Sequence, residues 1–306
     1  PVRYGPFIGG FNLTDVVIEG DSAAHSVIDG NGWGWWKKFH EKQQNITRGR
    51  LVEMLWSEDI IIQNLTLQNS PFWTTHLVYS SNILARGLTI LAPKDAPNTD
   101  GFDPDSSEHV ILVDAYISTG DDGIAIKSGW DCAGARYARP ARDIYIRNLT
   151  ADSNAGSVSI GSEMSGGVEN VLVRDAVAYG RGDGLHIKTS ASRGGYVRDI
   201  RFENVYIDGP EKTALNIGSS YGAPNPACNR TWDPLPPVVE NIEFVNIRIN
   251  RHPETPFKFE GLSSAPIKNL LLNNVTTGDG KGYFECSNVS GTAKDVSPQP
   301  CSELQP

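Results

Sequence analysis

Three aspartates that stand close to glycines carry the strongest chemical signal in the chain: Asp100, Asp121 and Asp122. An aspartate before a glycine is usually a turn residue. If the fold brings the three carboxylates together, however, their mutual repulsion raises at least one pKa and keeps a proton on the cluster in weakly acidic solution. Hydrolysis of a glycosidic bond requires such a division into one protonated and one ionised carboxylate. The elements that carry these residues therefore decide whether they do chemistry.

Eight short segments of alternating apolar and polar residues recur along the chain, which is the pattern of half-buried strands. Each has asparagine, aspartate or glycine at the same position, at intervals of 23 to 42 residues: Asn64, Gly87, Asp114, Asn148, Asp175, Asn204, Asn246 and Asn274. These residue types tolerate the left-handed backbone of a sharp turn, and their side-chain amides can stack from repeat to repeat. Apart from a short helix expected over residues 33–42, no helical pattern separates the strands.

Parallel strands without crossover helices stack as the coils of a solenoid, because an α/β sheet needs a helix between its strands. The sequence therefore predicts one all-β domain over residues 1–306, folded as a single-stranded right-handed parallel β-helix of about ten coils. An antiparallel β-sandwich is the alternative, but turn signals such as asparagine-glycine are too scarce for it. The first residues do not read as a natural start, so we expect a signal peptide and a first coil to precede them.

A second strand of each coil shares one register and carries the candidate chemistry. Its inward positions are apolar: Phe102, Ile124, Ile126, Val158, Ile160, Leu185, Ile187, Leu215 and Ile217. Its outward positions are mostly polar: Asp103, Ala125, Lys127, Ser159, His186, Lys188 and Asn216. Neighbouring strands lie ~4.8 Å apart, so distant parts of the chain meet on one outer face. Strict alternation would turn Asp100 and Asp122 inward, but a bend at the following glycines would swing both carboxylates out.

Four segments in this register resemble the signature segments of the polygalacturonases, family 28 of the glycoside hydrolases. They have the family's order and spacing: Asn98–Gly101, Gly120–Asp122, Ser159–Ser162 and His186–Lys188. The similarity runs from about residue 9 to the end of the chain, and the phrases IGSEMSGG, KSGWD and SPQPCSEL resemble a plant branch of the group. The resemblance implies an enzyme that hydrolyses α-1,4-galacturonosidic bonds of pectin with inversion at the anomeric carbon.

The resemblance also implies a role for each matching residue. Asp121 is the general acid, and Asp100 and Asp122 hold and activate the hydrolytic water. Lys188 binds a galacturonate carboxylate, as an outward cation facing a polyanion would, and Tyr221 lines the +1 side. The substrate-binding set is completed by His186 and by Asn98, which supports the site. No metal and no cofactor are expected, and the partner is pectin, an acidic polysaccharide.

Two positions depart from the family's pattern. A histidine is absent where Gly156 or Ser157 stands, and His186 replaces an arginine. Histidine offers no bidentate guanidinium fork, and its charge fades above pH ~6.5. A rhamnogalacturonan or a substituted galacturonan therefore stays open as the substrate. Two hypotheses compete with hydrolysis: a calcium-dependent pectin lyase and a non-catalytic cell-wall-binding β-helix. A lyase would need an aspartate-rich calcium loop beside an exposed arginine, and the sequence shows none. The intact aspartate trio argues against a non-catalytic wall-binding protein.

Net charge and cysteine content limit the kinds of binding partner and the cellular compartment that can be expected for the protein. A net charge of −9 argues against nucleic acid and anionic membranes. No apolar segment approaches the ~20 residues of a membrane span. The four cysteines lack the CxxC spacing of a zinc site. Cys286 and Cys301 enclose a short loop that suits a disulfide, whereas Cys132 and Cys228 either pair or stay free.

Seven Asn-x-Ser/Thr sequons also favour a secreted protein. Three of them lie at the repeated turn position and are expected to be structural: Asn64, Asn148 and Asn274. The other four are candidates for glycosylation: Asn12, Asn45, Asn229 and Asn288. Together with the expected disulfide, the sequons predict a secreted protein of the extracellular space or cell wall. We expect it to be a monomer.

Overall fold

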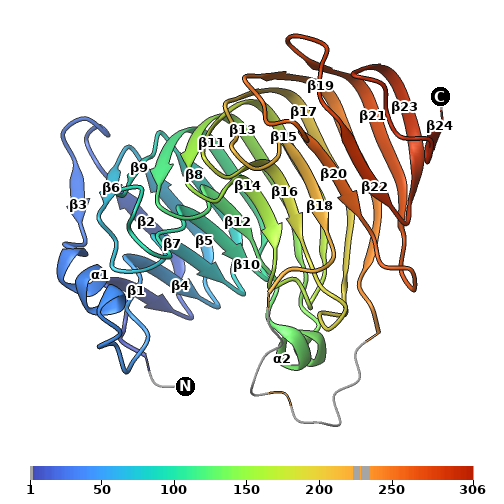
Figure 1. Ribbon diagram of the computed structural model, residues 1–306. Helices are drawn as coiled ribbons and strands as arrows, with labels where there is room; N and C mark the ends of the chain where they lie inside the picture. The colour runs from blue at the N-terminus through green and yellow to red at the C-terminus, as the bar shows by residue number, and fades with distance from the viewer. Residues whose placement is uncertain (1–2, 223–227, 229–234, 306) are drawn as a thin grey trace.

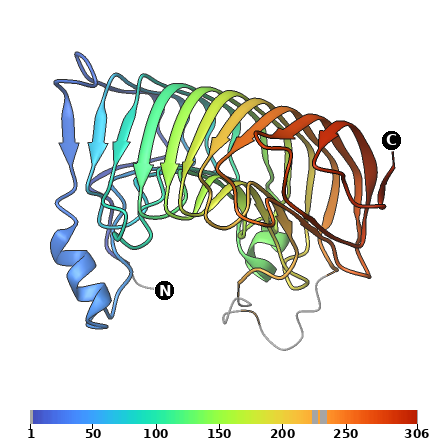
Figure 2. The same ribbon diagram turned by 45° about the horizontal axis from the view of Figure 1, so that its top comes forward.

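The computed structural model describes residues 3–222, 228 and 235–305. Its strands form two long sheets that wind around a common axis, with the first and last coils at opposite ends of the stack (Figure 1). Figure 2 shows the coils side by side along this axis. Every pairing between the named strands is parallel, for example those of β10, β12 and β14. The antiparallel sandwich is therefore wrong, and the predicted right-handed parallel β-helix is confirmed.

The first sheet carries the candidate site, and its ten strands match the expected number of coils. In spatial order they are β1 (Ile8–Phe11), β4 (Val52–Leu55), β7 (Thr75–Val78), β10 (Phe102–Asp105), β12 (Ile124–Ile126), β14 (Gly156–Gly161), β16 (Asp183–Lys188), β18 (Leu215–Gly218), β20 (Phe257–Glu260) and β22 (Phe284–Ser287). All nine inward positions predicted for this sheet are buried in one continuous core. The core also stacks aromatic rings from coil to coil, as between Phe257 and Phe284.

The second sheet has fourteen strands and forms the opposite wall of the coils. Its main path runs β2 (Thr14–Glu19), β5 (Glu58–Gln63), β8 (Ser81–Arg86), β11 (Glu108–Thr119), β13 (Ala141–Ser153), β15 (Val168–Gly180), β17 (Tyr196–Asp208), β19 (Val238–Asn250), β21 (Ile267–Thr277), β23 (Val289–Ser297) and β24 (Leu304–Gln305). Three short strands join it beside the early coils: β3 (Val27–Asp29), β6 (Thr66–Gln68) and β9 (Thr89–Leu91).

The predicted turn ladder is present along the second sheet. All eight of its residues have positive φ, between 51° and 59°. Side-chain amides connect successive coils: Nδ2 of Asn148 donates to Asp114 at 2.6 Å, and Nδ2 of Asn274 donates to Asn246 at 3.0 Å. These contacts support the structural role of the two sequon asparagines Asn148 and Asn274. Of the glycan candidates, Asn12, Asn45 and Asn288 are exposed, and Asn229 lies outside the described residues.

A second ladder lies five residues before the first and was not predicted. Its members also have positive φ: Asp59, Asn82, His109, Asp143, Asn170, Asp199, Asn241 and Asn269. Here too the amides bridge coils, as where Nδ2 of Asn241 donates to Asp199 at 2.8 Å. A long strand of the second sheet therefore contains two left-handed residues, as β13 does at Asp143 and Asn148, and the chain bends at each of them.

The described residues include two short helices, α1 (Trp33–His40) and α2 (Asp131–Tyr137). The helix expected near residue 33 is thus confirmed. No helix in the described ranges is long and apolar enough to cross a membrane. Both cysteine pairs form disulfides: Cys286–Cys301, as predicted, and Cys132–Cys228, which the sequence left open and which ties α2 to a residue 96 positions later in the chain.

Candidate active site

Two glycines set the bend that turns the site aspartates away from the core. Strands β10 and β12 begin directly after Gly101 and Gly123. A Cβ atom on Gly101 would lie 2.5 Å from the carbonyl oxygen of Gly123, and one on Gly123 would lie 2.7 Å from that of Ser157. Only glycine allows the backbones of successive coils to approach so closely. The regular strand therefore starts after each glycine, and the carboxylates of Asp100 and Asp122 face outward as predicted.

The three aspartates meet in a small pocket on the outer face of the first sheet. One carboxylate oxygen of each residue lies within 4.8 Å of those of the other two: Asp100, Asp121 and Asp122. The pocket has a volume of about 140 Å³ and is otherwise lined by Trp73, Asn98, Lys127, Ser162, Glu163, Lys188 and Tyr221. The fold thus brings together every predicted site residue except His186, which lies beside the pocket without lining it.

Asp122 is the most firmly held of the three carboxylates. Its Oδ1 accepts hydrogen bonds from the backbone N–H of Gly156 at 2.7 Å and from the hydroxyl of Ser159 at 2.9 Å. Its Oδ2 pairs with the ammonium group of Lys188. Burial alone would raise the pKa of Asp122, but the charges of Lys188 and Lys127 and these hydrogen bonds lower it below its usual value. Asp122 is therefore the ionised member of the cluster.

Gly156 also accounts for the absent histidine. A Cβ atom at this position would lie 2.1 Å from Oγ of Ser159 and 3.0 Å from Oδ1 of Asp122. A side chain at Gly156 would therefore displace the two groups that hold Asp122. The backbone amide of Gly156 and the hydroxyl of Ser159 occupy this space instead, so the carboxylate is oriented without an imidazole.

Asp121 has the opposite electrostatic character. Its Oδ1 accepts the backbone N–H of Asp122 at 2.9 Å, and its Oδ2 lies 3.5 Å from Nδ2 of Asn98. Burial and the neighbouring charge of Asp122 raise the pKa of Asp121 above its usual value. Asp121 therefore keeps its proton at a pH where Asp122 has lost its own, which is the division expected of an acid and a base.

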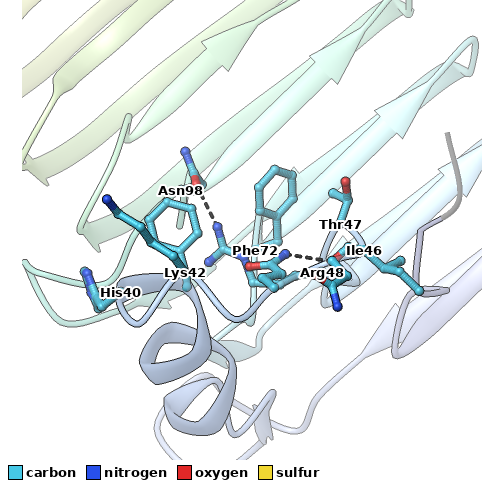
Figure 3. Close-up of a pocket in the computed structure, with 10 residues that line it drawn as sticks. His40, Lys42, Ile46, Thr47, Arg48, Phe72 and Asn98 are labelled. Carbon is cyan, nitrogen blue, oxygen red and sulfur yellow. Dashed lines mark hydrogen bonds between the residues drawn. The ribbon is translucent and has the colours of Figure 1, made fainter.

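A buried arginine, Arg48, orients the side-chain amide of Asn98. Nη2 of Arg48 donates to Oδ1 of Asn98 at 2.7 Å (Figure 3), which leaves Nδ2 of Asn98 to donate to Oδ2 of Asp121 at 3.5 Å. Arg48 also donates to two backbone carbonyls, those of Pro71 and Pro97. Burial lowers the pKa of Arg48 to about 10, and Asp121 opposes this shift. Arg48 is charged at any physiological pH and orients Asn98.

Asp100 lies between Asp121 and a buried lysine. Nζ of Lys127 is 3.5 Å from Oδ2 of Asp100 and 3.4 Å from Oε2 of Glu163. Oδ1 of Asp100 has no hydrogen-bond partner among the described residues, and neither carboxylate oxygen of the fully buried Asp103 has one. Burial raises the pKa of Asp100 well above its usual value, helped by Asp121, and burial together with Asp100 does the same for Asp103.

The carboxylate trio has oxygen atoms close enough to bind a metal ion. Two ammonium groups already occupy its surroundings, because Lys188 pairs with Asp122 and Lys127 pairs with Asp100. The charges of Asp100 and Glu163 keep the pKa of Lys127 well above its usual value despite burial. A divalent cation would have to compete with both lysines, so the donor set does not favour a resident metal. The absence of a metal stays a prediction.

His186 contacts Asp183 and Tyr221 and does not line the pocket of the trio. Its Nδ1 lies 3.1 Å from Oδ2 of Asp183, and its ring meets that of Tyr221 edge-on with centroids 5.9 Å apart. Burial would raise the pKa of Asp183, but hydrogen bonds from His186, Thr213 and Asn216 lower it to about 2. His186 therefore links a buried carboxylate to Tyr221, whose ring lies 5.1 Å from the ammonium group of Lys188.

We predict that Asp183→Asn lowers stability, because Asp183 is 6% exposed and is held ionised by its neighbours. A pKa lowered from 3.8 to about 2 corresponds to about 2 kcal/mol of stability. This contribution is present above pH ~4 and is lost as the pH falls through the folded pKa of ~2. Chemical denaturation at pH 6 and pH 2.5 measures it: the variant should lose stability at pH 6 and much less at pH 2.5. An equal loss at both values would contradict the ionic role of Asp183.

The sequence did not assign a role to three residues that complete the site: Arg48, Lys127 and Glu163. Lys127 was placed on the outer face, and its register beside Asp100 was the signal that could have marked it. Arg48 and Glu163 lie outside regular strands, so no register places them. Their contacts with Asn98 and Lys127 depend on how loops of separate coils pack together.

The chain is a parallel β-helix that carries, on one outer face, two carboxylates with opposite pKa shifts and two buried lysines. Comparisons with known proteins agree with this structural class. The model of the family "Glycosyl hydrolases family 28" matches residues 5–299. "Probable polygalacturonase" of Vitis vinifera is 41% identical over 308 residues, which are 99% of this chain and 61% of that protein. The chain thus spans about three fifths of the length of this relative.

Solved structures give the same result for the fold. A hyperthermoactive exopolygalacturonase from Thermotoga maritima superposes with a TM-score of 0.75 at 22% identity, covering 96% of this chain and 72% of that one. A polygalacturonase from Erwinia carotovora ssp. carotovora gives a TM-score of 0.72 at 25% identity, covering 94% and 73%. The chain belongs to glycosyl hydrolases family 28. This family agrees with the resemblance found in the four sequence segments.

Proposed function

We propose that the protein hydrolyses α-1,4-galacturonosidic bonds of pectin. The observation that carries the proposal is the division of protons within the trio: the pKa values of Asp100 and Asp121 are raised and that of Asp122 is lowered, with their oxygens within 4.8 Å. Family membership supports hydrolysis of glycosidic bonds as the reaction class. The name of the similar Vitis vinifera protein, "Probable polygalacturonase", supports galacturonan as the substrate.

In the proposed reaction Asp121 gives its proton to the oxygen that leaves the anomeric carbon. Asp122 takes a proton from the attacking water, whose oxygen forms the new bond as the glycosidic bond breaks. Asp100, which lines the same pocket, would help to hold that water. After product release Asp121 regains a proton from solvent and Asp122 loses one, so the cycle closes without a cofactor.

The proposed stereochemical outcome is inversion, by direct attack of water. The oxygens of the trio lie closer together than the roughly 6.5–9.5 Å common between the two carboxyl groups of inverting enzymes. Support comes instead from the environment of Asp122. Three hydrogen-bond donors surround its two oxygens, namely Gly156, Ser159 and Lys188. They restrain this carboxylate from attacking the sugar itself, which leaves water as the nucleophile.

Substrate contacts are proposed for residues that line the pocket or adjoin it. Lys188 would bind a galacturonate carboxylate and Tyr221 would line the +1 side, while Asn98 would support Asp121. His186 contributes through Tyr221, against which it packs. Because His186 replaces an arginine of the family's pattern, a substituted galacturonan or a rhamnogalacturonan stays the second candidate substrate. Two disulfides and the exposed sequons support secretion to the cell wall, and we propose a monomer.

One incubation tests this function. With polygalacturonate we expect new reducing ends, no ultraviolet absorbance of an unsaturated uronide, and an inverted anomer in the first product seen by proton NMR. Added EDTA should leave the rate unchanged, because the proposed mechanism uses no metal and two lysines already pair with the trio. A lyase would produce the absorbance and lose activity with EDTA. A wall-binding protein would produce no new ends, and retention would make an aspartate the nucleophile.

A further inference from the structure

A fourth aspartate, Asp103, has no role in the proposed reaction although it lies close to the trio. It follows Asp100 by three residues and stands on β10, where alternation with the core residue Phe102 turns its side chain to the outer face. The side chain is nevertheless fully buried, and it does not line the pocket of the trio. Substrate therefore cannot reach Asp103, and any part that it plays must pass through a neighbouring residue.

The strands beside Asp103 offer its carboxyl group no hydrogen-bond donor. Neither of its oxygens has a partner in the described part of the chain. On β7 it stands opposite His76, whose two ring nitrogens face Glu53 at 3.0 Å and Asp105 at 3.1 Å. On β12 the residue in the matching register is Ala125, which has no polar side-chain atom. An ionised carboxylate without donors is very costly in a protein interior, so this environment favours the neutral acid.

The cations of this region, Lys127 and Arg50, pair with other carboxylates. Nζ of Lys127 lies 3.5 Å from Asp100 and 3.4 Å from Glu163, and Arg50 pairs with the glutamate of β4 at 3.1 Å. The other titratable groups that face Asp103 are one histidine and three aspartates: His76, Asp100, Asp121 and Asp122. Burial, followed by the charge of Asp100, raises the pKa of Asp103 well above its usual value.

Asp100 also lacks a hydrogen-bond donor on one side. Its Oδ2 lies 3.5 Å from Nζ of Lys127, but its Oδ1 is buried without a hydrogen-bond partner among the described residues, as are both oxygens of Asp103. Two neighbouring carboxyl groups remove this deficit when one of them is protonated, because its O–H is the donor that the other lacks. The proton belongs on Asp103, because Asp100 has an ammonium group beside it to balance a negative charge.

We propose that Asp100 and Asp103 share one proton, and that Asp103 keeps it and donates its O–H to Asp100. Asp103 is then a positioning residue, which orients Asp100 and favours its ionised form while the acid Asp121 keeps a proton of its own. The inference rests on the proposed function for the use of Asp100 in holding water. The shared proton itself is a property of the folded protein, so it is measurable without substrate.

Asp103→Asn tests the proton, because asparagine is neutral at every pH, has nearly the same shape and can donate to Asp100. Unfolded aspartate is ionised above pH ~3.9, so the parent takes up one proton at Asp103 when it folds in weakly acidic solution. Its stability therefore falls as the pH rises, since the folded state binds more protons than the unfolded state. The folding constant of the parent, divided by that of Asp103→Asn, should decrease about tenfold per pH unit from pH ~4.5 to pH ~6. Chemical denaturation at several pH values measures this ratio.

Asp183→Asn is the matched control. Asp183 is also buried, but its pKa is lowered to about 2. It is therefore ionised in both the folded and the unfolded protein above pH ~4.5, and the corresponding ratio for Asp183→Asn should stay constant over that range. Infrared spectra give a direct readout, because the carbonyl band of one protonated carboxyl group at pH ~6 should be lost in Asp103→Asn and kept in Asp183→Asn. A constant ratio for both variants, with the band kept in both, would overturn the shared proton.

Asp103→Leu separates the role in catalysis from the role in folding. Leucine has a similar size but no donor, so Asp100 loses the hydrogen bond that favours its ionised form. Because a hydrogen bond to a charged group corresponds to about 1–2 pH units, the acid limb of kcat should report Asp100 and begin about 1–2 pH units higher than in the parent. Asp103→Asn, which restores a donor, should bring the limb back. If both variants lower the melting temperature and keep the parent's pH profile, Asp103 only fills space beside Asp100 and the proposal is wrong.

The proposed function and this inference fail in different ways. A parent protein that releases no reducing ends from polygalacturonate disproves the proposed function. The denaturation ratio and the infrared band still decide whether Asp103 holds the proton, because neither measurement uses substrate.

Discussion

Replacing Asp121 with asparagine should lower kcat by about 10²–10⁴-fold, the range typical of losing a general acid. Asparagine has nearly the same shape and can still accept the backbone N–H of Asp122, which Asp121 accepts at 2.9 Å. KM and the melting temperature should therefore change little. Initial rates on oligogalacturonides, with thermal melts on the same samples, measure both effects.

The pH profile gives this variant a second readout. In the proposed mechanism, activity requires Asp122 ionised and Asp121 protonated, so the acid limb should follow the lowered pKa and the basic limb the raised one. The basic limb should disappear from the residual activity of Asp121→Asn. The loss in kcat should also shrink on an oligomer with a nitrophenol leaving group, because that group departs without a proton.

Asp114→Asn is the matched control for the change from aspartate to asparagine. Asp114 is exposed in the turn ladder, where asparagine also occurs, and it accepts the amide of Asn148. Its replacement should alter neither rate nor stability. Full activity in Asp121→Asn would show that the acid lies elsewhere. If the activity of Asp121→Asn falls only in proportion to the fraction of folded protein, Asp121 is a structural turn residue and not the general acid.

The fold could be predicted in detail because its determinants are local. A residue that tolerates positive φ recurs once per coil, and the alternation beside it decides which side chains enter the core. The second ladder could also have been predicted from the sequence: Asn82 and Asn241, for example, lie five residues before Gly87 and Asn246. It was missed because Asp and Asn there precede the apolar segments and resemble ordinary turn residues.

The site was predictable only as far as register extends. Asp100 and Asp122 precede glycines at matching positions of successive coils, so the sequence could align them. The contacts of Arg48 and Glu163 come from loops whose paths no periodicity fixes. The position of His186 shows the same limit, because its register is correct but its partner Asp183 lies on the same strand, three residues earlier. Register places a residue on a face, and packing then decides what its side chain touches.

Lys188→Met should cause the largest combined loss of stability and activity. Lys188 and Asp122 form a pair in which both side chains are almost fully buried. Removing one partner of a buried ion pair typically costs about 3–5 kcal/mol, because the other charge stays behind without compensation. The pKa of Asp122, which Lys188 holds low, should rise. The acid limb of the pH profile should then move to higher pH, and kcat should fall as the base becomes protonated.

Lys258→Met is the matched control for Lys188→Met. Lys258 lies on β20 of the same sheet and pairs with the partly exposed Glu260 and Glu285, away from the trio. Exposed ion pairs contribute about 0–1 kcal/mol, so this variant should retain its stability and its pH profile. If both lysine variants behave alike, Lys188 is only a surface cation and does not set the ionisation of Asp122.

The double variant Asp122→Asn/Lys188→Met separates stability from catalysis. Removing both charges leaves no unpaired ion in the pocket, so much of the stability lost in Lys188→Met should return. Activity should not return, because no ionised carboxylate remains at position 122 to take the proton of water. Thermal melts and initial rates of the two single variants and the double variant form a complete cycle. Recovery of activity together with stability would mean that the pair holds the fold and that the base is another carboxylate.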